Sequence, residues 1–345
     1  MLLFATKIAY HIKIGTSARD HDHEQTLIRL SESVTVGIDM FDLLTVGHFA
    51  IDFIILPRKR QDEKPTLGGP PAYTSLAAKM LGARVSVLSK VGRDFPADYL
   101  DRLIRQDIDI AGLRKVDDCQ TTTFVLRYSE DGSRNINLKS KAPPINSIDI
   151  PKCMKANVVH IAPIANEVSV KILPPLRNMG TIVSLDPQGF LRRFDSDGNA
   201  YLTDNGDLCI LEGVNILKAS QEEMESLTGE VSLKKAFSRV MRRGVEIMIA
   251  TKGREGSILY NKGKIYAVPP APAKVVDTTG LGDVFIGAFL AEFLKQKEPV
   301  WCACVGSAAA SFVSEKIGPE GFANKKLVYE KATSIYRNVS ILWSC

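Results

Sequence analysis

The segment from Asp277 to Phe285, which reads DTTGLGDVF, carries the residues best suited to chemistry. Its glycines at positions 280 and 282 lack the Cβ atoms that would keep a phosphate away from the backbone. The apolar run that follows predicts a helix, and the first N–H groups and dipole of a helix favour an anion. Asp283 would place a carboxylate beside that anion, as phosphoryl transfer to a hydroxyl requires. The simpler alternative is that Asp283 only caps the helix.

Two earlier stretches also place glycines or an acid next to predicted elements. Leu67–Tyr73, which reads LGGPPAY, leads into a helical pattern that ends at Gly82. Thr45–Asp52, which reads TVGHFAID, is an apolar strand followed by a small-residue turn and an acid. Together with residues 277–285, these stretches resemble the ribokinase family of small-molecule kinases, also called the PfkB family, over residues 41–320.

The resemblance implies a role for each of these motifs. In the family an early aspartate binds substrate hydroxyls, a Gly-Gly turn lets the substrate approach, and a late aspartate is the catalytic base. By this resemblance Asp52 binds substrate and Asp283 takes the proton of the attacking hydroxyl. The substrate turn is Gly68 and Gly69, and the amides that stabilise the phosphoryl group are those of Gly280, Leu281 and Gly282.

The expected nucleotide-binding motif is neither a P-loop nor a Rossmann fingerprint. No GxxxxGK[ST] pattern is present, which excludes a P-loop, and the glycines do not fit a Rossmann fingerprint. Thr251–Gly256, which reads TKGREG, follows an apolar strand and resembles the family's T-x-G-x-x-G nucleotide loop. The small-residue helix at 306–310 resembles one that flanks adenine, and core packing explains it equally well. The resemblance implies ATP as the donor, with nucleotide-side residues Thr251, Gly253, Gly256, Lys218 and Ser307.

A divalent metal is expected, because Mg²⁺ neutralises the charge of a transferring γ-phosphoryl group. The family organises this metal through water with an N-x-x-E motif. The matching stretch is Ser220–Glu223, in which Glu223 keeps the acid and Ser220 replaces the asparagine. A hydroxyl can still bond a metal-bound water, so we expect altered metal affinity and retained activity. The alternative is that Glu223 is a solvated helix residue.

The residues that would select the acceptor resemble the inositol-kinase branch most closely. That branch shares V-G-H-x-x-x-D, matched by Val46–Asp52, and the DPQGF segment that begins at Asp186. Gln188 would bond a hydroxyl of a cyclitol or sugar, and Tyr73 is also placed among the substrate-binding residues. We therefore expect a small polyol or sugar substrate, either myo-inositol-like or a pentose or hexose.

Two other functions stay open. A nucleoside kinase of the same family would need an apolar or aromatic wall for the base, and Tyr73 and Phe124 are the candidates. A noncatalytic sugar-binding regulator with the kinase fold would explain the change at Ser220. Such a regulator would have no physical need to keep the base and the two glycines of the anion site.

Strand-like and helical patterns alternate from residue 43 onward. They predict a ribokinase-like α/β fold, with a mainly parallel sheet and helices on both faces. The predicted strands are 43–48, 84–89, 158–162, 182–186, 208–211, 214–218 and 245–251. The predicted helices are 70–81, 95–106, 166–179, 220–228, 231–243, 281–296, 299–316 and 325–337. Ligands bind beyond the carboxyl ends of such strands, where we expect Asp52, Gly69 and Asp186.

Additional β segments at about 51–66 and 119–139 interrupt the alternation. The second includes Thr121–Tyr128 and Arg134–Leu138, which flank an Asp-Gly hairpin signal. These segments resemble the small β lid of the family, which covers the substrate, excludes water and in some members forms a homodimer. An ordinary surface hairpin is the alternative.

Composition predicts a soluble, cytoplasmic enzyme. A chain of 345 residues with 45% hydrophobic and 24% charged residues can bury a large core. No apolar run reaches membrane-helix length, and the net charge of +5 is spread out, which argues against membrane and nucleic-acid partners. Six cysteines without a CxxC pair are typical of reduced core residues. Residues 40–340 are the expected kinase domain, and residues 1–39 an extension that is disordered or a misassigned start.

Overall fold

A computed structural model describes residues 40–57, 65–151, 154–177, 181–204 and 206–344. The extension predicted for residues 1–39 lies outside the described residues.

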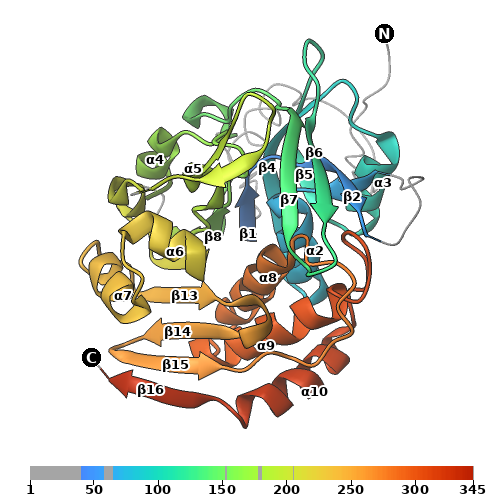
Figure 1. The fold of residues 1–345 in the computed structure, drawn as a ribbon. Helices are drawn as coiled ribbons and strands as arrows, with labels where there is room; N and C mark the ends of the chain where they lie inside the picture. The colour runs from blue at the N-terminus through green and yellow to red at the C-terminus, as the bar shows by residue number, and fades with distance from the viewer. Residues whose placement is uncertain (1–39, 58–64, 152–153, 178–180, 205, 345) are drawn as a thin grey trace, which may run out of the picture. The chain divides into compact units, whose positions relative to one another are not determined.

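The main sheet has ten strands in the order β16-β15-β14-β13-β12-β9-β8-β1-β4-β5 (Figure 1). Strands β13 to β5 of this order are parallel, and β14, β15 and β16 are antiparallel. The parallel strands β1, β4 and β8 are largely apolar and buried, because both faces of the sheet are covered. The strands are β16 (Ser340–Ser344), β15 (Lys264–Val268), β14 (Ser257–Asn261), β13 (Ile247–Thr251), β12 (Ile216–Ser220), β9 (Ile182–Leu185), β8 (Ala156–Ile161), β1 (Phe41–Val46), β4 (Val85–Gly92) and β5 (Asp109–Val116).

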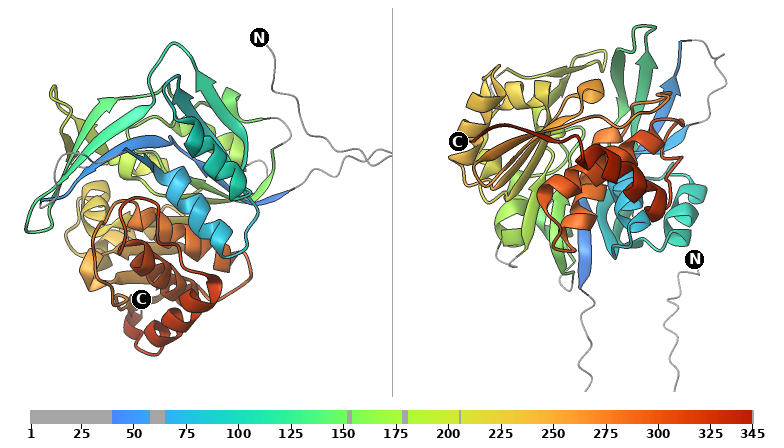
Figure 2. Two further views of the ribbon diagram at one scale, coloured as in Figure 1. Left: turned by 90° about the vertical axis from the view of Figure 1, so that its right-hand side faces the viewer. Right: turned by 90° about the horizontal axis from the view of Figure 1, so that it is seen from below.

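Helices cover both faces of this sheet (Figure 2). One face carries α2 (Pro70–Met80), α3 (Ala97–Arg105), α8 (Leu281–Phe293), α9 (Pro299–Val313) and α10 (Lys325–Tyr336). The other carries α4 (Leu173–Arg177), α5 (Gln188–Leu191), α6 (Gln221–Thr228) and α7 (Leu233–Met241). Helix α8 is buried from Asp283 to Glu292, which fits its apolar sequence. The predicted fold class is confirmed.

A second, smaller sheet has the order β3-β2-β6-β7. Its strands are β3 (Thr66–Gly68), β2 (Ala50–Ile55), β6 (Thr122–Tyr128) and β7 (Arg134–Ser140). It occupies the segments predicted to form the lid, and we call it the lid sheet; residues 58–64 of that prediction lie outside the described residues. The lid sheet contacts a hairpin of β10 (Arg192–Phe194) and β11 (Ala200–Leu202), where the Leu138 N–H donates to the Gly198 carbonyl at 2.8 Å.

Several predicted elements are wrong in detail. The strand expected at 208–211 is the 3₁₀ helix η3 (Leu208–Leu211), because the Asp207 carboxylate accepts from the Cys209 N–H and caps a turn. The helix expected at 166–179 is reduced to the 3₁₀ helix η2 (Val170–Ile172) and α4, in which consecutive prolines remove backbone donors. Asp52 lies within β2 rather than beyond a strand, because the chain passes from β1 into the lid sheet after a turn at 47–49.

Candidate active site

The start of α8 forms a cradle of exposed backbone. Gly280 is its N-cap, in the left-handed conformation with φ 70°, and Asp283 lies in its first turn. A Cβ atom at Gly280 would overlap the ring of Tyr73, and a Cβ atom at Gly282 would overlap the ammonium of Lys218. The two glycines therefore leave the amides bare and also make room for an aromatic ring and a positive charge.

Lys218, predicted as a nucleotide-side residue, lies beneath this helix start, with its ammonium next to Gly282. It comes from β12, and its ammonium donates to the Asp186 carboxylate, just beyond β9, at 2.6 Å. Both side chains are buried. Burial lowers the pKa of Lys218 and the carboxylates of Asp186, Glu223 and Asp283 raise it, with a net rise above its usual range. A fixed positive charge thus reinforces the dipole of α8 at the anion cradle.

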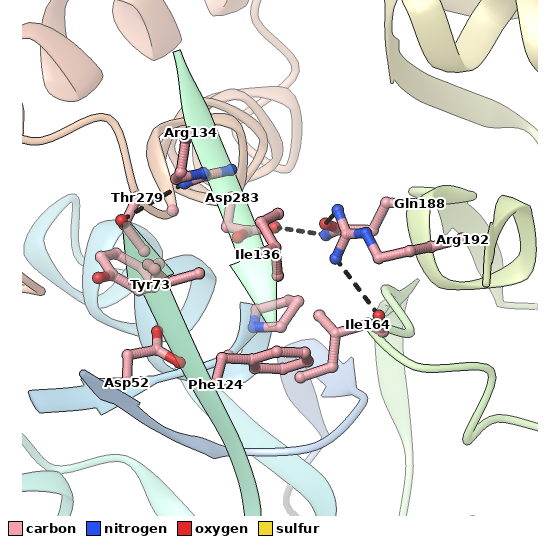
Figure 3. A pocket seen from close by; sticks show the side chains of 14 residues that line it. Asp52, Tyr73, Phe124, Arg134, Ile136, Ile164, Gln188, Arg192, Thr279 and Asp283 are labelled. Atoms are coloured by element: carbon pink, nitrogen blue, oxygen red, sulfur yellow. Dashed lines mark hydrogen bonds between the residues drawn. The ribbon is translucent and has the colours of Figure 1, made fainter. Parts of the chain in front are cut away.

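Asp283 is 8% exposed and faces a pocket (Figure 3). Burial raises its pKa to about 7; Asp186 and Glu223 also raise it, while Lys218 and Arg192 lower it. The Gln188 amide lies 3.5 Å from Asp283 Oδ1, and Arg192 donates to Gln188 Oε1 at 3.2 Å. A carboxyl with a pKa near neutrality is well matched to general-base chemistry.

Asp52 enters the same pocket from the lid sheet (Figure 3). A Cβ atom at Gly68 would overlap the Asp52 carboxylate, so this glycine makes room for the acid. Gly69 has φ 85°, which turns the chain tightly into α2, and it lines the pocket. Burial raises the pKa of Asp52 to about 7, aided by Asp277 and Asp283 and opposed by Arg134.

The pocket that contains both acids has an apolar side. The space between its lining atoms is about 440 Å³, a figure that includes open solvent. Its polar lining also includes Arg134, Gln188, Arg192 and Thr279. Its apolar lining is Phe124, Leu126, Ile136 and Ile164 (Figure 3). Phe124 packs in turn against Phe194, with ring centroids 6.1 Å apart. The pocket therefore offers both hydrogen-bonding groups and an aromatic surface.

The lid sheet is bonded to the loop that precedes α8. The Tyr128 hydroxyl donates to Asp277 Oδ1 at 2.8 Å and accepts from the Thr278 N–H at 3.1 Å. The same Asp277 accepts from the N–H groups of Thr279 and Gly318, at 2.8 and 2.9 Å. Arg134 adds a contact to the Thr279 hydroxyl at 3.4 Å. The lid thus fixes the segment that leads into the anion cradle.

The predicted site residues do not all line this pocket. Asp52, Gly69, Tyr73, Gln188, Gly280 and Asp283 line it. Gly68, Gly282 and Lys218 stand directly behind it, and Leu281 begins α8. Thr251, Gly253, Gly256, Ser307 and Glu223 are not among the lining residues. The tip of the lid hairpin at Gly132 approaches Arg254 of the 251–256 loop, which places that loop at the lid's edge.

Ser220 and Glu223 form a capping box at the start of α6. The Ser220 hydroxyl accepts from the Glu223 N–H at 3.1 Å, and Glu223 Oε2 accepts from the Ser220 N–H at 2.8 Å. Burial, together with Asp186, raises the pKa of Glu223. Within the described part of the chain, no three His, Cys, Asp or Glu side chains are grouped as direct metal ligands. Glu223 keeps one carboxylate oxygen outside the capping box for a water-mediated contact.

Sequence reasoning missed Arg134, Arg192 and Tyr128. Each is a single residue in β7, β10 or β6, and the pocket forms only when these strands meet α8. Arg134 begins the strand predicted after the hairpin turn, and this position was the available signal. The pairing of Lys218 with Asp186 joins ends of adjacent parallel strands and has no local signature.

The chain belongs to the pfkB family of carbohydrate kinases, which it matches over residues 40–326. It is thus a phosphotransferase that acts on an alcohol group. Cytidine kinase of Thermococcus kodakarensis is 30% identical over 286 residues, which cover 81% of this chain and 98% of that protein. Inositol 3-kinase of Oryza sativa is 27% identical over 307 residues, covering 84% and 72%. The solved nucleoside kinase of Methanocaldococcus jannaschii superposes with a TM-score of 0.68 at 26% identity, covering 86% and 99%.

Among the described helices, none is long and apolar enough to cross a membrane. The cytoplasmic location and the homodimer through the lid stay predictions.

Proposed function

We propose that this protein is an ATP- and Mg²⁺-dependent nucleoside kinase. The observation that carries the proposal is one pocket that combines two carboxylates with an apolar wall of Phe124, Leu126, Ile136 and Ile164. A nucleoside has a hydroxyl-rich sugar and a flat apolar base, and the two halves of the lining match these two parts. The likeness to a cytidine kinase and a nucleoside kinase supports the same acceptor.

The residues of the chain have distinct roles in this proposal. Asp52 accepts hydrogen bonds from ribose hydroxyls, and the aromatic ring of Phe124 contacts the base. Asp283 takes the proton from the attacking hydroxyl, with its pKa near 7 set by burial. The amides of Gly280, Leu281 and Gly282 and the Lys218 ammonium stabilise the charge that develops on the transferring phosphoryl group. The lid sheet excludes water, which would otherwise compete as acceptor.

The residues around α8 fit the donor. A Cβ atom at Gly280 would overlap the Tyr73 ring and one at Gly282 would displace the Lys218 ammonium, and the cradle stands over this buried cation, which suits an anionic phosphate group. Mg²⁺ usually keeps several waters and needs only one or two carboxylates, which suits Glu223 near the cradle. When bound, ATP with Mg²⁺ supplies the γ-phosphoryl group and neutralises part of its charge. Thr251, Gly253, Gly256 and Ser307 are proposed to hold the rest of the nucleotide.

The test is a coupled ADP-release assay with ATP and Mg²⁺. The acceptors are cytidine, uridine, adenosine, guanosine, myo-inositol, ribose and fructose, and the D283N variant controls for contaminating kinases. We expect at least one nucleoside to exceed every sugar and polyol in kcat/KM by about tenfold or more, because only a base gains from the apolar wall. Turnover of myo-inositol or a free sugar alone would overturn the nucleoside assignment and leave the kinase class intact.

A polyol kinase is the second candidate. Gln188, Arg192 and Arg134 add hydrogen-bonding groups to the pocket, and an inositol 3-kinase is among the relatives. A cyclitol, however, has hydroxyls around its whole ring, and some of them would face the apolar wall unpaired. A nucleobase can instead place its aromatic face against that wall, because its polar atoms lie at the edge of the ring.

A further inference from the structure

Tyr73 is the buried side chain of the pocket whose polar atom lacks a partner. The residue is 1% exposed, lines the pocket, and its hydroxyl has no hydrogen-bond partner within the described residues. Buried hydroxyls are rarely left unpaired in folded proteins, so such a group calls for a physical reason. In the view of Figure 3, Tyr73 lies between Asp52 and Thr279.

The position of this phenol is fixed by its surroundings. Its ring lies against Gly280, where a Cβ atom would overlap it, and it belongs to the buried first turn of α2. Burial and the nearby carboxylates of Asp52, Asp277 and Asp283 raise the pKa of Tyr73 well above its ordinary value. The phenol therefore keeps its proton and is a hydrogen-bond donor at every working pH.

The chemistry of Asp52 defines what this donor can pair with. Above its raised pKa of about 7 the Asp52 carboxylate is ionised and only accepts, so a substrate hydroxyl that donates to it has lone pairs left on its own oxygen. Asp52 makes no hydrogen bond through its carboxylate to another described residue that could compete for this role. Tyr73 lines the same pocket, and Asp52 is the charge that acts most on its phenol, so this donor can complete the pairing of that same hydroxyl.

We propose that Tyr73 is a specificity-determining residue, whose hydroxyl donates to the ribose hydroxyl that Asp52 accepts from. Together the two side chains read a hydroxyl as donor and acceptor at once. An acceptor that lacks this hydroxyl leaves both a buried phenol and a buried carboxylate unpaired, which is the condition for strong discrimination. The chemical class selected is a ribonucleoside over its deoxy analogue. This inference rests on the proposed nucleoside-kinase function.

The test is a double-mutant cycle in which one hydroxyl is removed from the enzyme and one hydroxyl is removed from the substrate. The wild type and the Y73F variant are assayed with the best ribonucleoside and with its 2′-deoxy and 3′-deoxy analogues. We expect the wild type to prefer the ribonucleoside by about 100-fold or more in kcat/KM over one analogue. In Y73F this preference falls about tenfold, because the variant loses activity on the ribonucleoside and little on that analogue. The matched control is Y336F, whose hydroxyl bonds Glu298 on the outer helices.

The outcomes separate the two levels of the argument. If the Y73F variant loses the same factor in kcat/KM on all three substrates, the inference is overturned and the nucleoside-kinase function still stands. A wild type that turns over no nucleoside overturns the proposed function and this inference with it. Thermal unfolding without ligand is a second check: Y73F is expected to melt no lower than the wild type, because its hydroxyl has no protein partner. A fall of about 5 °C or more would instead reveal a partner within the protein and overturn the inference.

Discussion

The ammonium of Lys218 lies 2.6 Å from the Asp186 carboxylate, in the interior beneath the first turn of α8. The pair joins the ends of two parallel strands and brings a positive charge to the anion cradle. The pair therefore has a structural role in stability and an electrostatic role at the cradle, and variants of the two residues can distinguish these roles.

Replacing Lys218 with Met is expected to destabilise the protein by about 3–5 kcal/mol, because it leaves the Asp186 charge buried and unpaired. The K218M/D186N double variant removes both charges and should recover most of that stability while kcat stays low. Urea unfolding and the ADP-release assay measure the two effects. Lys79, partly exposed and paired with the exposed Asp107, supplies the control K79M with a change below about 1 kcal/mol. Wild-type kcat in the double variant would exclude an electrostatic role for Lys218.

The D283N variant is expected to fold normally and to lose about 10²–10⁴-fold in kcat, the usual effect of removing a positioned base. Asparagine keeps the shape of the side chain, so substrate KM should change little. Steady-state kinetics with the preferred nucleoside provide the measurement. Turnover within a few-fold of the wild type would remove Asp283 from the base role.

Activity is expected to depend on pH through the same carboxyl. Asp283 must be ionised to accept a proton, and its pKa is raised to about 7, so kcat should rise with pH through about 7. The free energy of unfolding should instead fall as the pH rises. Asp52 and Asp283 both have pKa values above the unfolded value of 3.8, so the folded protein binds more protons between about pH 4 and 7 and loses stability across that window.

A kcat profile from pH 5 to 9 and melting curves over the same range check both statements. D283N should melt above the wild type at pH 8 by about 2–4 °C, and the difference should vanish near pH 4. A kcat that is flat across pH 6–8 would contradict the assignment of the raised pKa to the catalytic group.

Gly68 is expected to behave as part of the Asp52 site. A Cβ atom there overlaps the Asp52 carboxylate, so G68A should displace the acid and raise substrate KM by about tenfold, as should D52A. The informative variant is D52A/G68A, whose KM should match that of D52A alone, because there is no carboxylate left to displace. Multiplicative effects in the double variant would show that Gly68 acts independently of Asp52.

We expect the Tyr128 hydroxyl to hold the lid sheet against residues 277–279, the loop that precedes α8. Y128F removes the donor to Asp277, so kcat should fall about tenfold as the segment before α8 loosens. Amide hydrogen exchange at residues 122–140 and 277–282 should accelerate in the same variant. Unchanged exchange in both segments would show that other contacts hold the lid.

The fold was largely predictable because its parallel strands and helices carry strong hydrophobic patterns. Strands such as β1 and β8 are buried apolar runs, and α8 and α9 are long apolar helices. The antiparallel strands β14 to β16 were missed because they are short and partly exposed. Lys262 and Gly263, both with positive φ, form the tight turn between β14 and β15 and were the overlooked signal.

The candidate site was predictable where its residues are close in sequence. Asp283 and its glycines form one motif, and Asp52 and Gly69 each lie in a separate motif. The opposing wall was not predictable, since Ile136 and Ile164 come from separate segments. Phe124 was named only as a candidate for a base wall, and its place in the pocket depends on how the lid sheet docks. Lys218 was assigned to the nucleotide side, and spacing along the chain does not show that it also pairs with Asp186.

The lid sheet has a consequence for how new substrates can arise in this molecule. The proposed acceptor-binding groups all lie in the first half of the chain: Asp52, Phe124, Leu126 and Ile136 on the lid sheet, Tyr73 at the start of α2, and Ile164 just after β8. The proposed transfer groups, Lys218 and residues 280–283, lie in the second half of the chain. Selection can therefore redesign the acceptor within one half while the transfer machinery of the other half stays intact. Directed evolution toward a different alcohol is best confined to the lid strands and the start of α2.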